Sequence, residues 1–380
     1  MKSTPNTLQF SAPWAWDVFC HVIDNFGDAG VAWRLCVQLA QRGHSVRLWM
    51  DDPSPLAWMA PQGHPGVQVI PWDPHRWNHS VEPAQVVIET FGCTLPQPYV
   101  RRMGERVDQG AVPPVWINLE YLSAEDYVER SHRLPSPQRT PQGRVWSKWF
   151  FYPGWTDRTG GLLRETGLEI RRSGFDRDAW LAELGVKRRP AERVVSLFCY
   201  QSAPVSDLLK MLQGTPTLIM TTPGPASLLT QGWPTEATDV RIHALPWLSQ
   251  IDYDQVLWSA DFNIVRGEDS LVRAVWARAP FVWQIYPQHD GVHERKLQAF
   301  LSEMLQAFSA PQARAVRQFM RWWNRLETPL PMPPEWVQWA DWRRDLQPWT
   351  DALCAQPDLV TQLTTFVQER FHPAELDENP

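Results

Sequence analysis

The chain is poor in cysteine, and the cysteines that it has lie far apart. Only five occur in 380 residues, namely Cys20, Cys36, Cys93, Cys199 and Cys354. The close pairs that zinc sites and disulfide frameworks require are missing. The sequence therefore predicts neither a metal centre nor a disulfide framework, and it fits a reducing compartment.

Long apolar runs and an excess of basic charge are missing as well. No stretch reaches the roughly 18 apolar residues of a membrane span, and residues 1–16 lack the apolar core of a signal peptide. The formal net charge is -6, which argues against a general nucleic-acid surface. We expect a soluble, cytoplasmic protein with neither nucleic acid nor membrane as its partner.

What is present indicates an α/β protein of two domains. The length suffices for two domains of ordinary size, and a hydrophobic content of 43% is typical of a folded protein. Short apolar runs alternate with helical periodicity, which favours parallel sheets with crossover helices. We expect strands at 18–23, 46–50, 67–70, 86–88, 115–119, 194–198, 217–221, 241–245, 262–265 and 281–285, and helices at 250–259, 270–277, from 293, 310–325 and 361–370.

The alternation predicts two Rossmann-like halves. We place an N-terminal domain at 1–180, a C-terminal domain at 181–360, and a C-terminal helix and tail at 361–380 that can pack back on the first domain. The proline-bearing stretch 129–161 reads as a loop, and the charged segment 187–193 as a linker.

The first of two informative turns runs from Ile23 to Gly30, between a predicted strand and a predicted helix. It lacks the G-x-G-x-x-G spacing of a dinucleotide site. Asp28 sits just before the helix, where its carboxylate either caps backbone N–H groups or points into a cleft as a general base. Asp24 has the same two interpretations, and the structural one is favoured.

The second turn runs from Val265 to Ser270, again between a strand and a helix. Gly267 stands at the helix start, so the N–H groups of Asp269 and Ser270 could hold a diphosphate. The alternatives are an ordinary N-cap with acidic first-turn residues, and a plain ion pair between Arg266 and Glu268.

Other side chains carry less information. Most of the 23 tryptophans should pack in cores, and a few could stack on a base or a sugar. Four histidines, His21, His243, His289 and His293, are alternative bases, but a lone histidine is usually structural. No Ser/His/Asp or Cys/His nucleophile is evident.

Five segments, in this order, resemble one family. They are Ile23–Asp28, Glu120–Glu125, Thr159–Leu162, Val265–Ser270 and Ile285–Gln288. Together they are similar to EarP, the bacterial protein-arginine rhamnosyltransferase family that modifies elongation factor P. The resemblance runs from about Asp17 to the C-terminal helix.

The resemblance implies a GT-B fold with the active site between two Rossmann-like domains. It implies transfer of rhamnose from dTDP-β-L-rhamnose to one arginine of elongation factor P, with inversion and without a metal or other cofactor. Two other hypotheses stay open: a GT-B enzyme with another acceptor, and a non-catalytic module that binds elongation factor P.

The resemblance also implies roles for single residues. Asp28 and Glu268 match the catalytic carboxylates, and Glu268 could bind sugar hydroxyls, orient Arg266 or position the acceptor guanidinium. Trp247 stands where we expect Phe, and Cys199 stands where Gly would fit. The residues expected to bind substrate are Asp24, Asn25, Phe26, Gly27, Phe198, Tyr200, Trp247, Gln250, Arg266, Gly267, Asp269, Ser270 and Tyr286.

Overall fold

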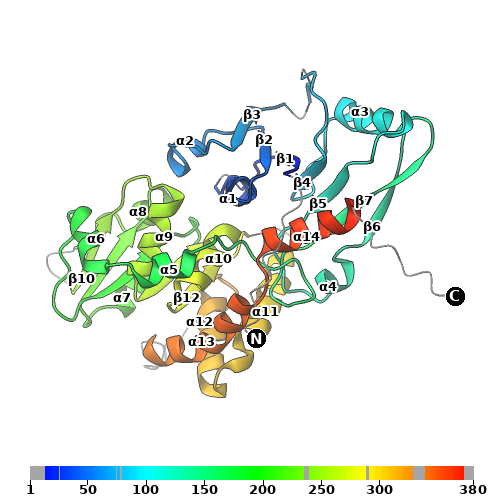
Figure 1. Ribbon diagram of the computed structural model, residues 1–380. Helices are drawn as coiled ribbons and strands as arrows, with labels where there is room; N and C mark the ends of the chain where they lie inside the picture. Colours follow the sequence, from blue (N-terminus) through cyan, green and yellow to red (C-terminus); the bar gives the residue numbers. More distant parts are fainter. Residues whose placement is uncertain are drawn as a thin grey trace, which may run out of the picture.

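Two β-sheets, one mostly and one entirely parallel, are covered by helices and form the two halves of the molecule (Figure 1). The computed structural model describes residues 13–24, 26–73, 75–77, 79–234, 239–287, 291–327 and 339–371. No helix within these ranges has the length and apolar character that crossing a membrane requires.

The first sheet has seven strands in the order β3-β2-β1-β4-β5-β7-β6. Neighbouring strands are parallel except β6 and β7. The strands are β1 (Ala15–Cys20), β2 (Ser45–Met50), β3 (Val67–Pro71), β4 (Val86–Thr90), β5 (Val115–Leu119), β6 (Pro135–Arg139) and β7 (Val145–Phe151). The helices of this half are α1 (Gly27–Gln41), α2 (Leu56–Met59), α3 (Gln97–Asp108) and α4 (Tyr127–Ser131).

The second sheet has five parallel strands in the order β10-β9-β8-β11-β12. The strands are β8 (Arg193–Leu197), β9 (Thr217–Thr221), β10 (Val240–Ala244), β11 (Phe262–Arg266) and β12 (Phe281–Gln284). The remaining helices are α5 (Leu168–Ser173), α6 (Arg177–Glu183), α7 (Val205–Met211), α8 (Pro225–Leu229), α9 (Gln250–Ser259), α10 (Glu268–Ala277), α11 (Val292–Met304), the 3-10 turn η1 (Leu305–Ala307), α12 (Ala310–Trp323), α13 (Trp339–Ala355) and α14 (Leu359–Phe371).

The predicted strands are all present, with shifted ends. The first begins at Ala15 rather than at Val18 and ends at Cys20, because the fully buried Trp16 belongs to the core and His21 is exposed. The predicted second-domain helices are also present.

The prediction of a loop at 129–161 was wrong. This stretch contains α4 and the antiparallel pair β6–β7. Prolines at 135 and 137 argue against a central strand, but β6 is the edge strand of the sheet and pairs on one side only. Proline is tolerated there because the outer N–H groups have no partner to lose.

Both sheets reverse their winding at one point. In each, the order of the first five strands along the sheet is third, second, first, fourth and fifth, so the switch lies between β1 and β4 and between β8 and β11. Ligands of doubly wound sheets bind outside the carboxyl ends of the strands at this point. The two turns singled out in the sequence follow β1 and β11, at these two positions.

The C-terminal helix α14 returns to the first sheet (Figure 1). Its buried residues Leu363 and Phe366 lie in one apolar cluster with Val18 of β1 and Ile117 of β5. Trp180 and Leu181 of α6 instead lie in a cluster of the second half. The boundary placed at residue 180 stays a prediction.

Candidate active site between the two sheets

The two turns meet in space, and Gly267 makes this possible. Gly267 has φ +70°, a backbone conformation that glycine adopts at little cost. An added Cβ would lie 3.4 Å from Asp24 Oδ2 and 3.7 Å from the Tyr200 hydroxyl. That hydroxyl donates a hydrogen bond to Asp24 Oδ2 at 3.0 Å. The first turn therefore packs directly on the loops of the second sheet.

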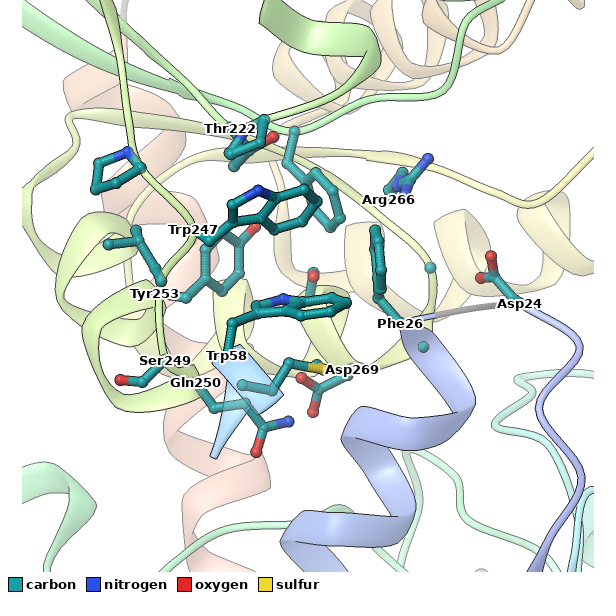
Figure 2. Close-up of a pocket in the computed structure, with 18 residues that line it drawn as sticks. Asp24, Phe26, Trp58, Thr222, Trp247, Ser249, Gln250, Tyr253, Arg266 and Asp269 are labelled. Atoms are coloured by element: carbon teal, nitrogen blue, oxygen red, sulfur yellow. The ribbon is translucent and has the colours of Figure 1, made fainter. Parts of the chain in front are cut away.

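A single pocket collects most of the residues predicted to bind substrate (Figure 2). It encloses about 760 Å³ of empty space, counting its open mouth. The predicted residues that line it are Asp24, Phe26, Gly27, Phe198, Trp247, Gln250, Arg266, Gly267, Asp269 and Ser270. Both halves of the chain contribute to it.

Arg266 supplies a positive charge to this pocket. Its guanidinium lies over the rings of Phe198 and Tyr200, 4.5 Å from each centroid, and 5.8 Å from that of Phe26. Among the described residues it forms no ion pair. The expected alternative of an ion pair with Glu268 is therefore wrong, because that carboxylate is held by Lys296.

Helix α10 begins close to Arg266 in the chain, and residues at its start line the pocket. Ser270 lies in the first turn of this helix and lines the pocket. The hydroxyl of Tyr253, which also lines the pocket, is buried without a hydrogen-bond partner of good geometry in the described chain, although Ser270 lies close to it. A positive charge, free helix N–H groups and an unused hydroxyl form a suitable site for a diphosphate.

Asp28 lies inside the first turn of α1 rather than before the helix. Its Oδ2 accepts hydrogen bonds of 2.9 Å from the N–H groups of Ile23 and Asp24, so it closes the turn instead of capping α1. Burial raises the pKa of Asp28, the two backbone hydrogen bonds oppose this, and the charges of Asp24 and Glu268 add to it. Burial likewise raises the pKa of Asp24.

Glu268 joins the two halves at the edge of the pocket. Its Oε2 accepts a hydrogen bond of 2.9 Å from the N–H of Leu122, and its Oε1 lies 2.6 Å from Lys296 Nζ. Burial raises the pKa of Tyr121, and the negative charges of Asp28 and Glu268 raise it further, so Tyr121 lies close to both catalytic candidates. Neither Asp28 nor Glu268 lines the main pocket; Glu268 borders a smaller cavity next to it.

The remaining predicted residues lie around the pocket. Tyr200 contacts Asp24 and Arg266 as described, and Tyr286 meets Tyr200 edge-on at 5.7 Å with 47% of its surface exposed. Gln250 donates through Nε2 to the Gly30 carbonyl at 3.0 Å, so it holds α1 as well as lining the pocket. Asn25 and the motif residue Gln288 lie outside the described residues.

An aromatic group at the mouth of the pocket escaped the sequence reasoning. Trp58 lies 4.8 Å from Trp247 and 5.4 Å from Phe26, measured between ring centroids. Trp58 and Phe26 come from the first half and Trp247 from the second (Figure 2). One tryptophan among many, in a four-residue helix, carries no signal in the sequence.

Other lining residues that were not predicted are Met59, Thr222, Pro223, Pro246, Leu248, Ser249 and Tyr253. Two of the alternative bases, His21 and His243, do not line the pocket. His21 pairs with Asp51, and burial lowers the pKa of His243. His289 lies outside the described residues.

Comparisons with known proteins agree with this arrangement. A family model described as Elongation-Factor P (EF-P) rhamnosyltransferase EarP matches residues 16–368. A protein-arginine rhamnosyltransferase of Pseudomonas aeruginosa is 40% identical over 388 residues, covering 93% of this chain and 98% of that protein. One of Pseudomonas putida is 42% identical over 381 residues, covering 92% and 98%.

A solved structure points the same way. It is described as the structural basis for EarP-mediated arginine glycosylation of translation elongation factor EF-P. It shares 31% identity with this chain at a TM-score of 0.64, covering 94% of this chain and 99% of that one. The resemblance noted in the sequence is confirmed: this chain has the GT-B glycosyltransferase fold and belongs to the EarP family of protein-arginine rhamnosyltransferases.

Proposed function

We propose that this chain transfers L-rhamnose from dTDP-β-L-rhamnose to an arginine side chain of elongation factor P, with inversion and without a metal. The observation that carries the proposal is the pocket between the sheets, where Arg266, which has no ion pair among the described residues, and the start of α10 lie beside the carboxylate-bearing turn of Asp24 and Asp28. The names of the relatives support the acceptor.

The acceptor guanidinium is protonated at physiological pH, and its nitrogen lone pairs are delocalised. A carboxylate can hold two of its N–H groups, orient one nitrogen and take a proton as the new C–N bond forms. We assign this role to Asp28. Its Oδ2 is used by two backbone N–H groups, so Oδ1 is the atom that we expect to face the acceptor.

The leaving dTDP gains negative charge as the glycosidic bond breaks. Arg266 and the N–H groups at the start of α10 are arranged to stabilise that charge, as preorganised donors do in other enzymes. A single displacement gives inversion and needs no covalent enzyme intermediate. The same charges can do the work that a divalent metal does elsewhere.

Glu268 belongs to the acceptor side in this proposal. Its two described contacts, Leu122 and Lys296, join the loop after β5 to α11. Neither contact involves Arg266, so orientation of Arg266 is the least supported of its three predicted roles. Positioning of the guanidinium or of the sugar hydroxyls fits the contacts better.

Intact-mass analysis tests the proposal. Purified elongation factor P is incubated with this protein and dTDP-β-L-rhamnose, without added metal. One deoxyhexose on one arginine is the expected result. Unchanged mass, with folded protein and tight dTDP binding, would indicate a GT-B enzyme with another acceptor. Binding of elongation factor P without dTDP binding or turnover would indicate the non-catalytic module.

A further inference from the structure

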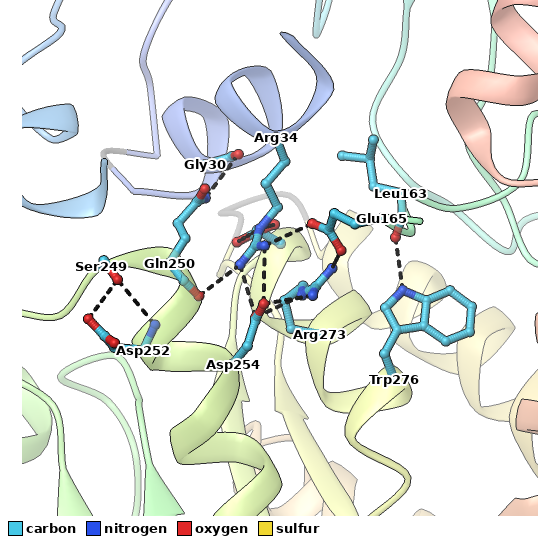
Figure 3. Close-up of polar contacts among 11 residues, drawn as sticks. Gly30, Arg34, Leu163, Glu165, Ser249, Gln250, Asp252, Asp254, Arg273 and Trp276 are labelled. Atoms are coloured by element: carbon cyan, nitrogen blue, oxygen red, sulfur yellow. Dashed lines mark hydrogen bonds and ion pairs between the residues drawn. The ribbon is translucent and has the colours of Figure 1, made fainter. Parts of the chain in front are cut away.

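A buried network of charged side chains joins α1 of the first half to α9 and α10 of the second (Figure 3). Its members are Arg34, Glu165, Asp254, Asp269 and Arg273. Two guanidinium groups face three carboxylates, so the network carries little excess charge. Only one of its members, Asp269, also lines the donor pocket.

Arg34 is held too firmly to move into that pocket. Its Nη2 lies 3.0 Å from Asp254 Oδ1 and its Nη1 lies 3.0 Å from Glu165 Oε1. The Gln250 carbonyl accepts a further hydrogen bond from Nη2 at 3.3 Å. The remaining nitrogen, Nε, lies 3.0 Å from Asp269 Oδ1 and 3.3 Å from its Oδ2.

The contact between Arg34 and Asp269 affects the donor pocket because of where Asp269 lies. Asp269 is the second residue of α10, the helix whose first N–H groups face the proposed diphosphate. A carboxylate in the first turn of a helix can itself bond to those N–H groups, and it repels a nearby phosphate. Left free, Asp269 would compete with the donor for its own binding site.

Gly30 leaves room for the contact. It lies on α1, one helical turn before Arg34, and an added Cβ would meet Asp269 Oδ2 at 3.3 Å and Gln250 Nε2 at 3.0 Å. The close approach of α1 to α10 therefore brings Arg34 onto the carboxylate from the opposite domain. A carboxylate that lines the pocket is thus paired with an arginine of the other half.

We propose that Arg34 is a positioning residue that sets donor affinity by holding the Asp269 carboxylate away from the donor diphosphate. This inference rests on the proposed function. Under this inference the Asp269 carboxylate weakens donor binding, whereas a side chain that binds the donor would strengthen it. The inference also makes donor binding in one domain depend on a side chain of the other.

Calorimetric titration of dTDP into the full chain tests this, with the variants Arg34→Met, Asp269→Asn and their combination. Without Arg34 the Asp269 carboxylate is free to repel the diphosphate at short range, so we expect Arg34→Met to weaken dTDP binding at least about tenfold. Asp269→Asn alone should tighten binding by about two- to threefold, and the double variant should return to within about threefold of the unaltered chain.

Arg42→Met is the matched control. Arg42 follows α1 and forms contacts of 2.7 and 2.9 Å with Asp358, far from the pocket. It should lower the melting temperature and leave dTDP affinity unchanged. A purely structural role of Arg34 would instead leave the double variant as weak as Arg34→Met, which would overturn the inference.

Asp269→Asn keeps the test decisive should Arg34→Met not fold. If this single variant loses dTDP affinity, Asp269 is a donor ligand and the inference is wrong. The proposed function survives that result. Failure of the unaltered chain to bind dTDP would instead overturn the donor assignment and the inference with it.

Discussion

At the scale of single residues, the two turns combine structure and chemistry in the same side chains. Asp28 closes its own turn through Oδ2, and Asp24 joins that turn to Tyr200. The structural role of Asp28 in closing the turn and the proposed role as a base are therefore compatible, although Asp28 does not cap α1. Oδ2 makes the two backbone contacts of the turn, and Oδ1 is the oxygen that the proposal assigns to the acceptor.

Replacement of Asp28 by Asn should separate these two roles. The amide oxygen can still accept from the N–H groups of Ile23 and Asp24, so the melting temperature should change little. Turnover should fall by about 10²- to 10⁴-fold, which is the usual contribution of a general base. Single-turnover kinetics, with dTDP titration as a check on binding, measures both.

Asp52→Asn is the matched control, because Asp52 is exposed after the neighbouring strand β2. It should behave like the unaltered chain. Normal turnover in Asp28→Asn would reduce Asp28 to a structural residue.

The pH dependence of kcat/KM follows from the same carboxylate. Burial raises the pKa of Asp28, and a base must be deprotonated to act. Activity should therefore rise with pH through an acid limb that lies above the ordinary aspartate range of about 3.9. A kcat/KM profile between pH 4 and 8 measures the limb, and a profile that is flat down to the ordinary range would contradict this assignment.

Trp58 should contribute to the donor site from the opposite domain. Its ring lies against Trp247, which the resemblance to the EarP family places in the segment that binds the thymine of the donor. Stacking of a base on an aromatic side chain is worth about 1–3 kcal/mol, so Trp58→Ala should weaken dTDP binding by about fivefold or more. Trp258→Ala serves as control, since Trp258 packs against Phe175 away from the pocket; equal losses in both variants would point to general destabilisation.

At the scale of elements, helices α1, α9 and α10 are joined by buried charges rather than by an apolar seam alone. Breaking such a network leaves a buried charge without compensation. Glu165 pairs with both arginines, at 3.0 Å to Arg34 and 2.7 Å to Arg273. Burial raises its pKa, but the two arginines more than offset this and bring it to about 2.

This lowered pKa predicts how stability depends on pH. A carboxylate whose pKa is lowered on folding stabilises the fold above its unfolded value, about 4.3, and loses that effect as the pH falls toward the folded value. Glu165→Gln should therefore be less stable than the unaltered chain at pH 7, and the difference should shrink at pH 3. Urea unfolding at the two pH values measures this, and a difference that grows in acid would contradict it.

At the scale of the whole molecule, the C-terminal helix α14 packs on the first half, although it follows the second half along the chain. The chain crosses to the second half after β7 and returns through α14, whose apolar residues complete the core of the first sheet. Arg370 of this helix lies over the ring of Trp149, 4.4 Å from its centroid. The first half is therefore incomplete without the last described segment of the chain.

Leu363→Asp should expose this dependence. Leu363 is fully buried, and placing a charge there adds a desolvation cost to the loss of packing, so we expect at least about 3 kcal/mol of destabilisation. Gln368→Asp, at an exposed position of the same helix, is the control and should change little. Thermal unfolding compares the two, and equal stability would show that α14 is dispensable.

How much the sequence predicts depends on the range of the interactions involved. Strands such as 86–88 and 115–119 were predictable because a strand in a parallel sheet is buried on both faces and reads as an apolar run. The edge strand β6 was not, since its prolines are acceptable only at an edge, and the edge is a property of the assembled sheet.

The candidate site also has a part that local sequence predicts and a part that depends on contacts between distant residues. The sequence by itself determined the two carboxylate-bearing turns, their glycines and the family, because strand-to-helix turns are local and glycine marks unusual backbone conformations. Only the tertiary structure decided which partner each side chain takes: Lys296 rather than Arg266 for Glu268, Arg34 for Asp269, and Trp58 for Trp247. These pairs join residues that are distant along the chain, and their energies depend on burial and distance, which no local pattern of residues encodes.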